Sequence, residues 1–147
     1  MVTCIDGTIV RGTCTASGIT KFQTVGGTLR MQYPFFKRGG LSFQGMHAGT
    51  INISIAPKEF CILRADYTFY NIKWRSNHPV ENFSFVRCFI VFGNNRYPGF
   101  IYFPHPETKQ GVFSGFSLIE VLTRFIPGIS YGQKISCVFS SAQIKIF

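Results

Sequence analysis

Thr50 and Asn52 are the residues whose types and spacing best suit a metal site. They stand two positions apart in the stretch GTINISI, residues 49–55. Side chains two positions apart on an extended strand project from the same face, so a hydroxyl and an amide oxygen would lie side by side. Mg²⁺ prefers oxygen ligands and keeps several of its waters, so two neutral protein ligands are compatible with it. The alternative, an ordinary strand with a polar solvent face, stays open.

The residues around this pair predict a strand entered from a tight turn. Isoleucine occupies every second position from Ile51 to Ile55, and the positions between are polar. Such alternation indicates one buried and one polar face. Gly49 permits a tight turn immediately before the strand. The pair would therefore be held by a strand whose other face is anchored in a core.

The rest of the chain is typical of an all-β protein. Turn residues recur about every eight to twelve positions between short apolar runs, which predicts about eight or nine strands. The first, 3–11, is a strand or a hairpin turning at Asp6-Gly7; another is expected at 21–25, and the longest at 82–92. Residues 28–40 look too irregular for a helix. A helix is expected from Ser117, as N-cap, to Phe125. We expect one domain, residues 1–147: a small β-barrel with one short helix near the C-terminus.

The charge is strongly basic. Fifteen Lys and Arg oppose six acidic residues, a net charge of +9. This balance favours anionic partners such as phosphates, nucleotides or nucleic acid. Only Lys37-Arg38 forms an adjacent basic pair, so a merely solvated basic surface remains an alternative.

Several classes of protein are disfavoured. The spacing of the five cysteines includes no C-x-x-C, which disfavours a zinc site. The cysteines are expected to be reduced and mostly buried. No apolar run reaches the length of a membrane span, and the first residues lack a signal peptide's apolar region, so we expect a cytoplasmic protein without membrane contact. No G-x-S-x-G, H-E-x-x-H or Ser-His-Asp set is apparent, and no general base is identified.

A loop rich in small residues follows the first predicted strand. Backbone amides in such a loop can approach a phosphate closely, although it lacks the G-K-[ST] of a Walker loop and an ordinary loop is the alternative. Its candidate phosphate-contacting residues are Gly12, Thr13, Cys14, Thr15, Ala16, Ser17 and Gly18.

Motifs along nearly the whole chain resemble one enzyme family. They are I-x-G-x-I-V-x-G at 5–12, the small-residue loop, an aromatic stretch at 33–36, GTIN at 49–52, G-F-I-x-x-P at 99–104, I-E-V-L at 119–122 and Y-G-Q-K-I at 131–135. In this order they resemble the archaeal-type CTP-dependent riboflavin kinases, which have a cradle-loop β-barrel. The GTIN block and the order of the elements are the most specific parts of the likeness.

The resemblance implies an activity and a site. The family transfers the terminal phosphate of CTP to riboflavin, giving FMN, and its GTIN motif holds Mg²⁺, here through Thr50 and Asn52. The loop from Gly12 to Gly18 would lie on the nucleotide phosphates. Thr108 and Glu120 would contact the flavin. Phosphoryl transfer needs mainly positioning and charge neutralisation, which a basic barrel can supply.

Two alternatives stay open. The segment 123–132 lacks the family's A-P-x-x-L-R signature, which belongs to the nucleotide end, so the phosphate donor and retained activity are open. The rival interpretation is a non-catalytic basic barrel that binds nucleic acid through a basic groove and stacking aromatics.

Overall fold

Nine strands and one helix make up the part of the chain that the computed structural model describes, residues 1–11, 28–47, 49–108 and 115–147. In chain order they are β1 (Val2–Val10), α1 (Thr28–Arg38), β2 (Ile51–Ser54), β3 (Phe60–Ile62), β4 (Tyr67–Ile72), β5 (Glu81–Phe92), β6 (Asn95–Pro104), β7 (Leu118–Thr123), β8 (Lys134–Ser140) and β9 (Ile144–Ile146).

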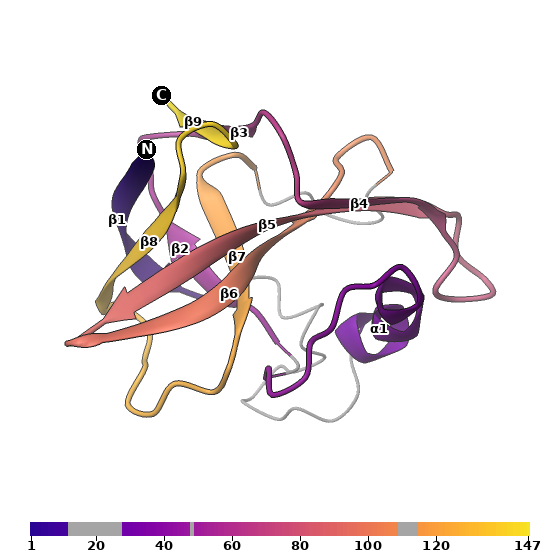
Figure 1. Cartoon of the computed structure of the whole chain (residues 1–147), viewed down its shortest axis with the longest axis horizontal. Helices are drawn as coiled ribbons and strands as arrows, with labels where there is room; N and C mark the ends of the chain where they lie inside the picture. The colour runs from indigo at the N-terminus through magenta and orange to yellow at the C-terminus, as the bar shows by residue number, and fades with distance from the viewer. Residues whose placement is uncertain (12–27, 48, 109–114) are drawn as a thin grey trace.

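Six strands form a closed antiparallel β-barrel, which confirms the predicted fold class. Their order is β5, β6, β7, β2, β1 and β8, and β8 closes the circle by pairing with the second half of β5. The first half of β5 extends beyond the barrel and pairs with β4 instead (Figure 1). β3 and β9 form a separate two-stranded sheet near the N- and C-termini.

Two apolar clusters hold this architecture together. The first fills the barrel and includes Ile53, Ile90 and Val121, all fully buried. The second lies between α1 and the outer face of the sheet, where Phe36 of the helix meets Phe85 of β5. Because strand side chains alternate, each barrel strand beneath α1 contributes to both clusters.

The helix predicted from Ser117 to Phe125 is wrong, since this stretch contains β7. β7 pairs with β2 on one side and with β6 on the other. Ile119 and Val121 are buried inside the barrel, and Leu122 is buried on the opposite face in the second cluster. A strand that is buried on both faces loses the alternation of a half-exposed strand. Its apolar residues then resemble a helical stripe, which explains the error.

The helix α1 lies in the N-terminal half, in a stretch that looked too irregular for a helix. Pro34 interrupts the sequence of α1. However, Leu29, Gln32 and Phe36 fall on one face and are buried against the sheet. Tertiary packing of such a face contributes most of a helix's stability, and it outweighs the local cost of the proline. Gly40, with φ of +96°, follows the helix end.

β1 runs as one strand through Asp6-Gly7, so the hairpin alternative at this position is wrong. Gly7 is needed for close approach, because a Cβ there would lie 2.5 Å from Ile53 Cγ2 on β2. The expected strand at 21–25 and the loop 12–18 lie outside the described residues.

β4 is the irregular strand of the main sheet. Its register with β5 shifts between Phe69 and Ile72. Asn71, within this irregularity, has a left-handed backbone with φ of 57°. Its backbone N–H donates to Asn82 Oδ1 of β5 at 2.8 Å, which holds the distortion in place.

Four of the cysteines lie in the described residues, and all four are free thiols. Cys88 and Cys137 are buried, whereas Cys4 and Cys61 are exposed. The expectation of mostly buried thiols therefore holds for two of these four. The single described helix is too short and too polar to cross a membrane.

Candidate functional site

Thr50, Asn52 and Glu120 bring three oxygen atoms together at the start of β2. Thr50 Oγ1 lies 3.3 Å from Asn52 Oδ1 and 3.5 Å from Glu120 Oε1. Asn52 and Glu120 are direct partners in the β2–β7 register, so their side chains share the outer face of the barrel. The pair predicted from sequence is thus adjacent, and a carboxylate from a distant strand joins it.

The Thr50 hydroxyl faces two acceptor oxygens, Asn52 Oδ1 and Glu120 Oε1. A threonine hydroxyl has a single proton and can donate it to only one of the two facing oxygens at a time. Neutral oxygens with one carboxylate form a donor set suited to Mg²⁺. The described residues contain no group of three or more His, Cys, Asp or Glu that could hold a metal ion. A hard cation at the cluster would need further oxygens, such as those of water or a substrate phosphate.

The cluster lies beside the end of β1. Val10, the last residue of β1, is the register partner of Asn52. The chain then continues through Arg11 towards the predicted phosphate-contacting residues 12–18, which themselves lie outside the described residues.

α1 places a buried polar pair next to Glu120. The Tyr102 hydroxyl of β6 donates to Gln32 Oε1 of α1 at 2.8 Å, and both side chains are buried. Burial raises the pKa of Tyr102 well above its ordinary value, and the negative charge of Glu120 adds to this effect. Tyr102 therefore stays protonated and remains a donor that fixes the helix over the sheet.

Positive charge also borders this region. The pKa of His47 lies below its ordinary value because burial disfavours the imidazolium and because Arg30 of α1 adds a like charge nearby. The backbone N–H of His47 donates to Thr123 O of β7 at 2.9 Å. Arg30 thus supplies a permanent positive charge near His47.

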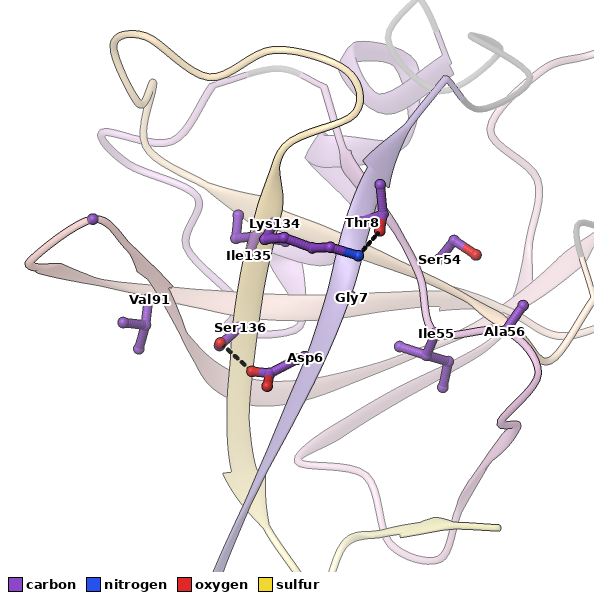
Figure 2. Close-up of a pocket in the computed structure, with 11 residues that line it drawn as sticks. Asp6, Gly7, Thr8, Ser54, Ile55, Ala56, Val91, Lys134, Ile135 and Ser136 are labelled. Atoms are coloured by element: carbon purple, nitrogen blue, oxygen red, sulfur yellow. Dashed lines mark hydrogen bonds between the residues drawn. The ribbon is translucent and has the colours of Figure 1, made fainter.

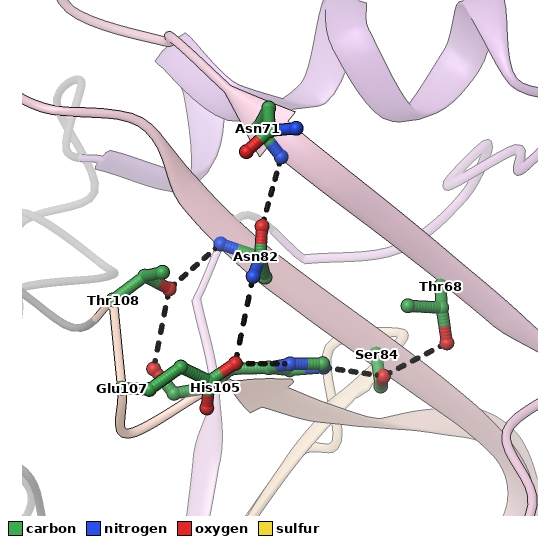
Figure 3. Close-up of polar contacts among 7 residues, drawn as sticks. All are labelled: Thr68, Asn71, Asn82, Ser84, His105, Glu107 and Thr108. Carbon is green, nitrogen blue, oxygen red and sulfur yellow. Dashed lines mark hydrogen bonds and ion pairs between the residues drawn. The ribbon is translucent and has the colours of Figure 1, made fainter.

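Thr108, the other predicted flavin contact, belongs to a second polar cluster (Figure 3). Its hydroxyl accepts a hydrogen bond from the Asn82 backbone N–H at 2.8 Å and donates to His105 O at 3.4 Å. The structure therefore brings Glu120, but not Thr108, into the cluster around Thr50 and Asn52.

The second cluster contains a Ser–His–Glu relay that the sequence did not reveal. Ser84 Oγ lies 2.7 Å from His105 Nε2, and His105 Nδ1 lies 3.1 Å from Glu107 Oε2. A hydrolase triad has the same order of groups. However, Ser84 is only 5% exposed, and its hydroxyl also bonds Thr68 Oγ1 at 3.0 Å. We interpret the relay as a clamp that fastens the turn after β6 to β5 and β4.

This interpretation predicts a stability defect for Ser84→Ala. The change removes the partner of a largely buried His105 nitrogen, which should lower the free energy of unfolding by about 1–3 kcal/mol. Urea denaturation measures it, and Thr68→Val, on the exposed side of the same hydroxyl, should cost less. Labelling of the wild type by a serine-directed fluorophosphonate, lost in Ser84→Ala, would contradict the clamp and favour a nucleophile.

A groove further along β1 and β2 was not anticipated from the sequence (Figure 2). It has a volume of about 570 Å³ and is lined by β1, β2, β8 and the tip of the β5–β6 hairpin. Lys134 Nζ donates to Thr8 Oγ1 at 3.0 Å, and Ser136 Oγ donates to Asp6 Oδ1 at 2.5 Å. The polar groups thus largely satisfy each other, and Lys134 places a positive charge at the groove.

Comparison of the chain with protein-family models and with curated proteins found no match. The likeness to the riboflavin kinases therefore stands on the motifs quoted above, and the activity it implies stays a prediction.

Proposed function

We propose that this protein is a Mg²⁺-dependent phosphotransferase that phosphorylates riboflavin to FMN, with CTP as the donor by resemblance. The observation that supports the proposal best is the convergence of Thr50, Asn52 and Glu120 oxygens within 3.5 Å, from two strands that are far apart in sequence. The closed barrel agrees with the fold that the resemblance implies.

The residues of the cluster have distinct roles in this proposal. Thr50 and Asn52 would hold Mg²⁺, and Glu120 supplies the negative charge that balances it. The metal would neutralise charge on the transferring phosphate and align it with the acceptor hydroxyl. Residues 12–18 would contact the phosphates through backbone N–H groups, and Arg30 would add a positive charge from α1.

α1 contributes by covering the sheet next to the cluster. Its buried contact through Gln32 and Tyr102 keeps this part of the outer face away from water. A dry surround strengthens electrostatic interactions with a phosphate. The helix also fixes Arg30 relative to His47. Glu120 and Thr108 remain the predicted flavin contacts, the first from within the cluster and the second from the turn after β6.

The proposal predicts Mg²⁺-dependent formation of FMN. The protein would be incubated with riboflavin and either CTP or ATP, with and without Mg²⁺, and the flavins separated by chromatography. FMN is expected only with the metal and a nucleotide, and the comparison of CTP with ATP identifies the donor. Metal binding should be weak in isolation and tighter with nucleotide, since only one carboxylate is present.

Absence of FMN with either nucleotide, together with unchanged riboflavin fluorescence at high micromolar protein, would contradict the proposal. Quenched fluorescence without turnover would instead identify a relative that binds flavin but has lost the transfer step.

A further inference from the structure

The outer face of β5 and β6 carries a strip of aromatic and basic side chains, most of them exposed. We call it the β5–β6 strip and define it by four residues, Arg87 and Phe89 of β5 and Arg96 and Phe100 of β6. Phe89 is 41% exposed, and the Arg87 side chain is 61% exposed. Solvent thus reaches both an aromatic ring and a cation on this sheet face.

Register places the members of the strip on one face. Arg87 is the direct partner of Phe100, and Phe89 is the direct partner of Pro98, two residues after Arg96. Direct and diagonal cross-strand neighbours lie on the same side of a sheet. The strip therefore forms a continuous surface.

Each arginine stacks on a ring of the strip. Arg96 Cζ lies 4.3 Å from the centroid of Phe89, and Arg87 Cζ lies 5.9 Å from that of Phe100. Tyr67 of β4 extends the row, with its centroid 5.4 Å from Arg87 Cζ. A guanidinium plane beside an aromatic ring is a platform on which a nucleobase stacks well.

The strip leads towards the groove shown in Figure 2. Val91, one of the residues lining that groove, is the register partner of Arg96 on β6 and of Ser136 on β8. Lys134, on the same face of β8 as Ser136, adds a cation there. Aromatic rings and cations thus follow one another across three strands, as a nucleic-acid backbone with unstacked bases requires.

Charge favours an anionic partner at this surface. The net charge of the chain is +9. Of the two ion pairs found in the described residues, one joins Arg87 to Asp66 and the other joins His105 to Glu107. Arg96 and Lys134 are in neither pair, so their charges remain available to phosphates.

We propose that the β5–β6 strip binds single-stranded nucleic acid. Bases stack on Phe89, the exposed ring of the strip, and phosphates contact Arg96 and Lys134. This surface is separate from the cluster at Thr50, so the inference does not depend on the proposed phosphotransferase activity.

The test is fluorescence anisotropy with a labelled oligothymidylate of about 15 nucleotides, long enough for the site sizes of small barrels. The full chain is expected to bind it, with affinity falling steeply as salt rises because counterions are released. The double variant Phe89→Ala with Arg96→Ala should bind at least about tenfold more weakly, since it removes one stacking ring and one phosphate contact.

A matched control removes another cation–aromatic pair, one that lies outside the strip. Lys145 lies over the ring of Phe147 with Nζ 6.0 Å from its centroid, and both are exposed. Lys145→Ala with Phe147→Ala changes net charge and aromatic content as the strip variant does, yet binding should stay within about twofold of the wild type. Melting curves confirm that both variants fold.

Three results would overturn the inference. The first is no binding of the oligothymidylate at low salt, and the second is an equal loss of affinity in the strip and control variants. The third is a strip variant that loses as much affinity for a duplex of the same length as for the single strand. Riboflavin phosphorylation measured on the strip variant should equal that of the wild type, which keeps the two proposals separable.

Discussion

Replacing Asn52 by alanine is expected to lower the turnover of riboflavin phosphorylation about 100-fold or more, while the melting temperature changes little. The amide oxygen of Asn52 lies 3.3 Å from Thr50 Oγ1 on the outer face of β2, away from the barrel core. Its loss removes a metal ligand, so the charge developing on the transferred phosphate is poorly neutralised. Steady-state kinetics at several Mg²⁺ concentrations measure the effect, and higher Mg²⁺ should recover part of the rate.

Ser54→Ala provides the control for this prediction. Ser54 lies on the same strand and face as Asn52, two positions further on, and is equally half-buried. It is outside the cluster, so its removal should leave turnover nearly unchanged. Thr50→Val and Glu120→Gln should resemble Asn52→Ala. A fully active Asn52→Ala protein would contradict the metal assignment and most of the argument for the kinase family.

Replacing Phe36 by alanine is expected to lower the free energy of unfolding by about 3–5 kcal/mol. Phe36 is completely buried between α1 and the sheet. Its ring lies 4.9–5.2 Å from the ring centroids of Phe69, Phe83 and Phe85. The truncation removes these contacts and leaves a cavity that surrounding rings from several strands cannot easily fill.

Phe35→Ala is the matched change on the same helix. Phe35 is half-buried and stacks with Arg38 at 4.7 Å from its ring centroid to Cζ. Its loss should therefore cost much less, within about 1 kcal/mol, as for other surface positions. Urea denaturation of both variants makes the comparison. Equal losses would show that Phe36 does not anchor the helix. A loosened α1 should also lower riboflavin phosphorylation, because Arg30 and Gln32 move with it.

The strands were predictable where one face is buried and the other is not. β2 and β8 alternate clearly, so their positions follow from period two alone. β7 does not, because Ile119 and Leu122 are buried on opposite faces, and a local pattern cannot distinguish this arrangement from a helix. α1 is a helix that the local sequence did not predict, because Pro34 lies inside it. The helix is stabilised by the packing of Phe36 against residues that are distant in sequence.

The site was predictable only in part, for a similar reason. Thr50 and Asn52 are neighbours by strand geometry, so their spacing alone placed them together. Glu120 reaches them because β7 pairs with β2 in one particular register, which no local pattern reveals. Ser84 and His105 likewise meet only through the pairing of β5 with β6, and for that reason the sequence contained no visible Ser–His–Glu set.

The irregular β4 bears on self-association. Closure of the barrel pairs its strands on both sides, so within the described part of the main sheet β4 is the strand left with an open edge. A regular open edge is a template for a second chain and a route to aggregation. Here the register shift after Phe69 and the left-handed Asn71 interrupt the row of backbone groups that a regular incoming strand would have to match. The distortion of β4 thus hinders a second chain from adding a strand to this edge of the sheet.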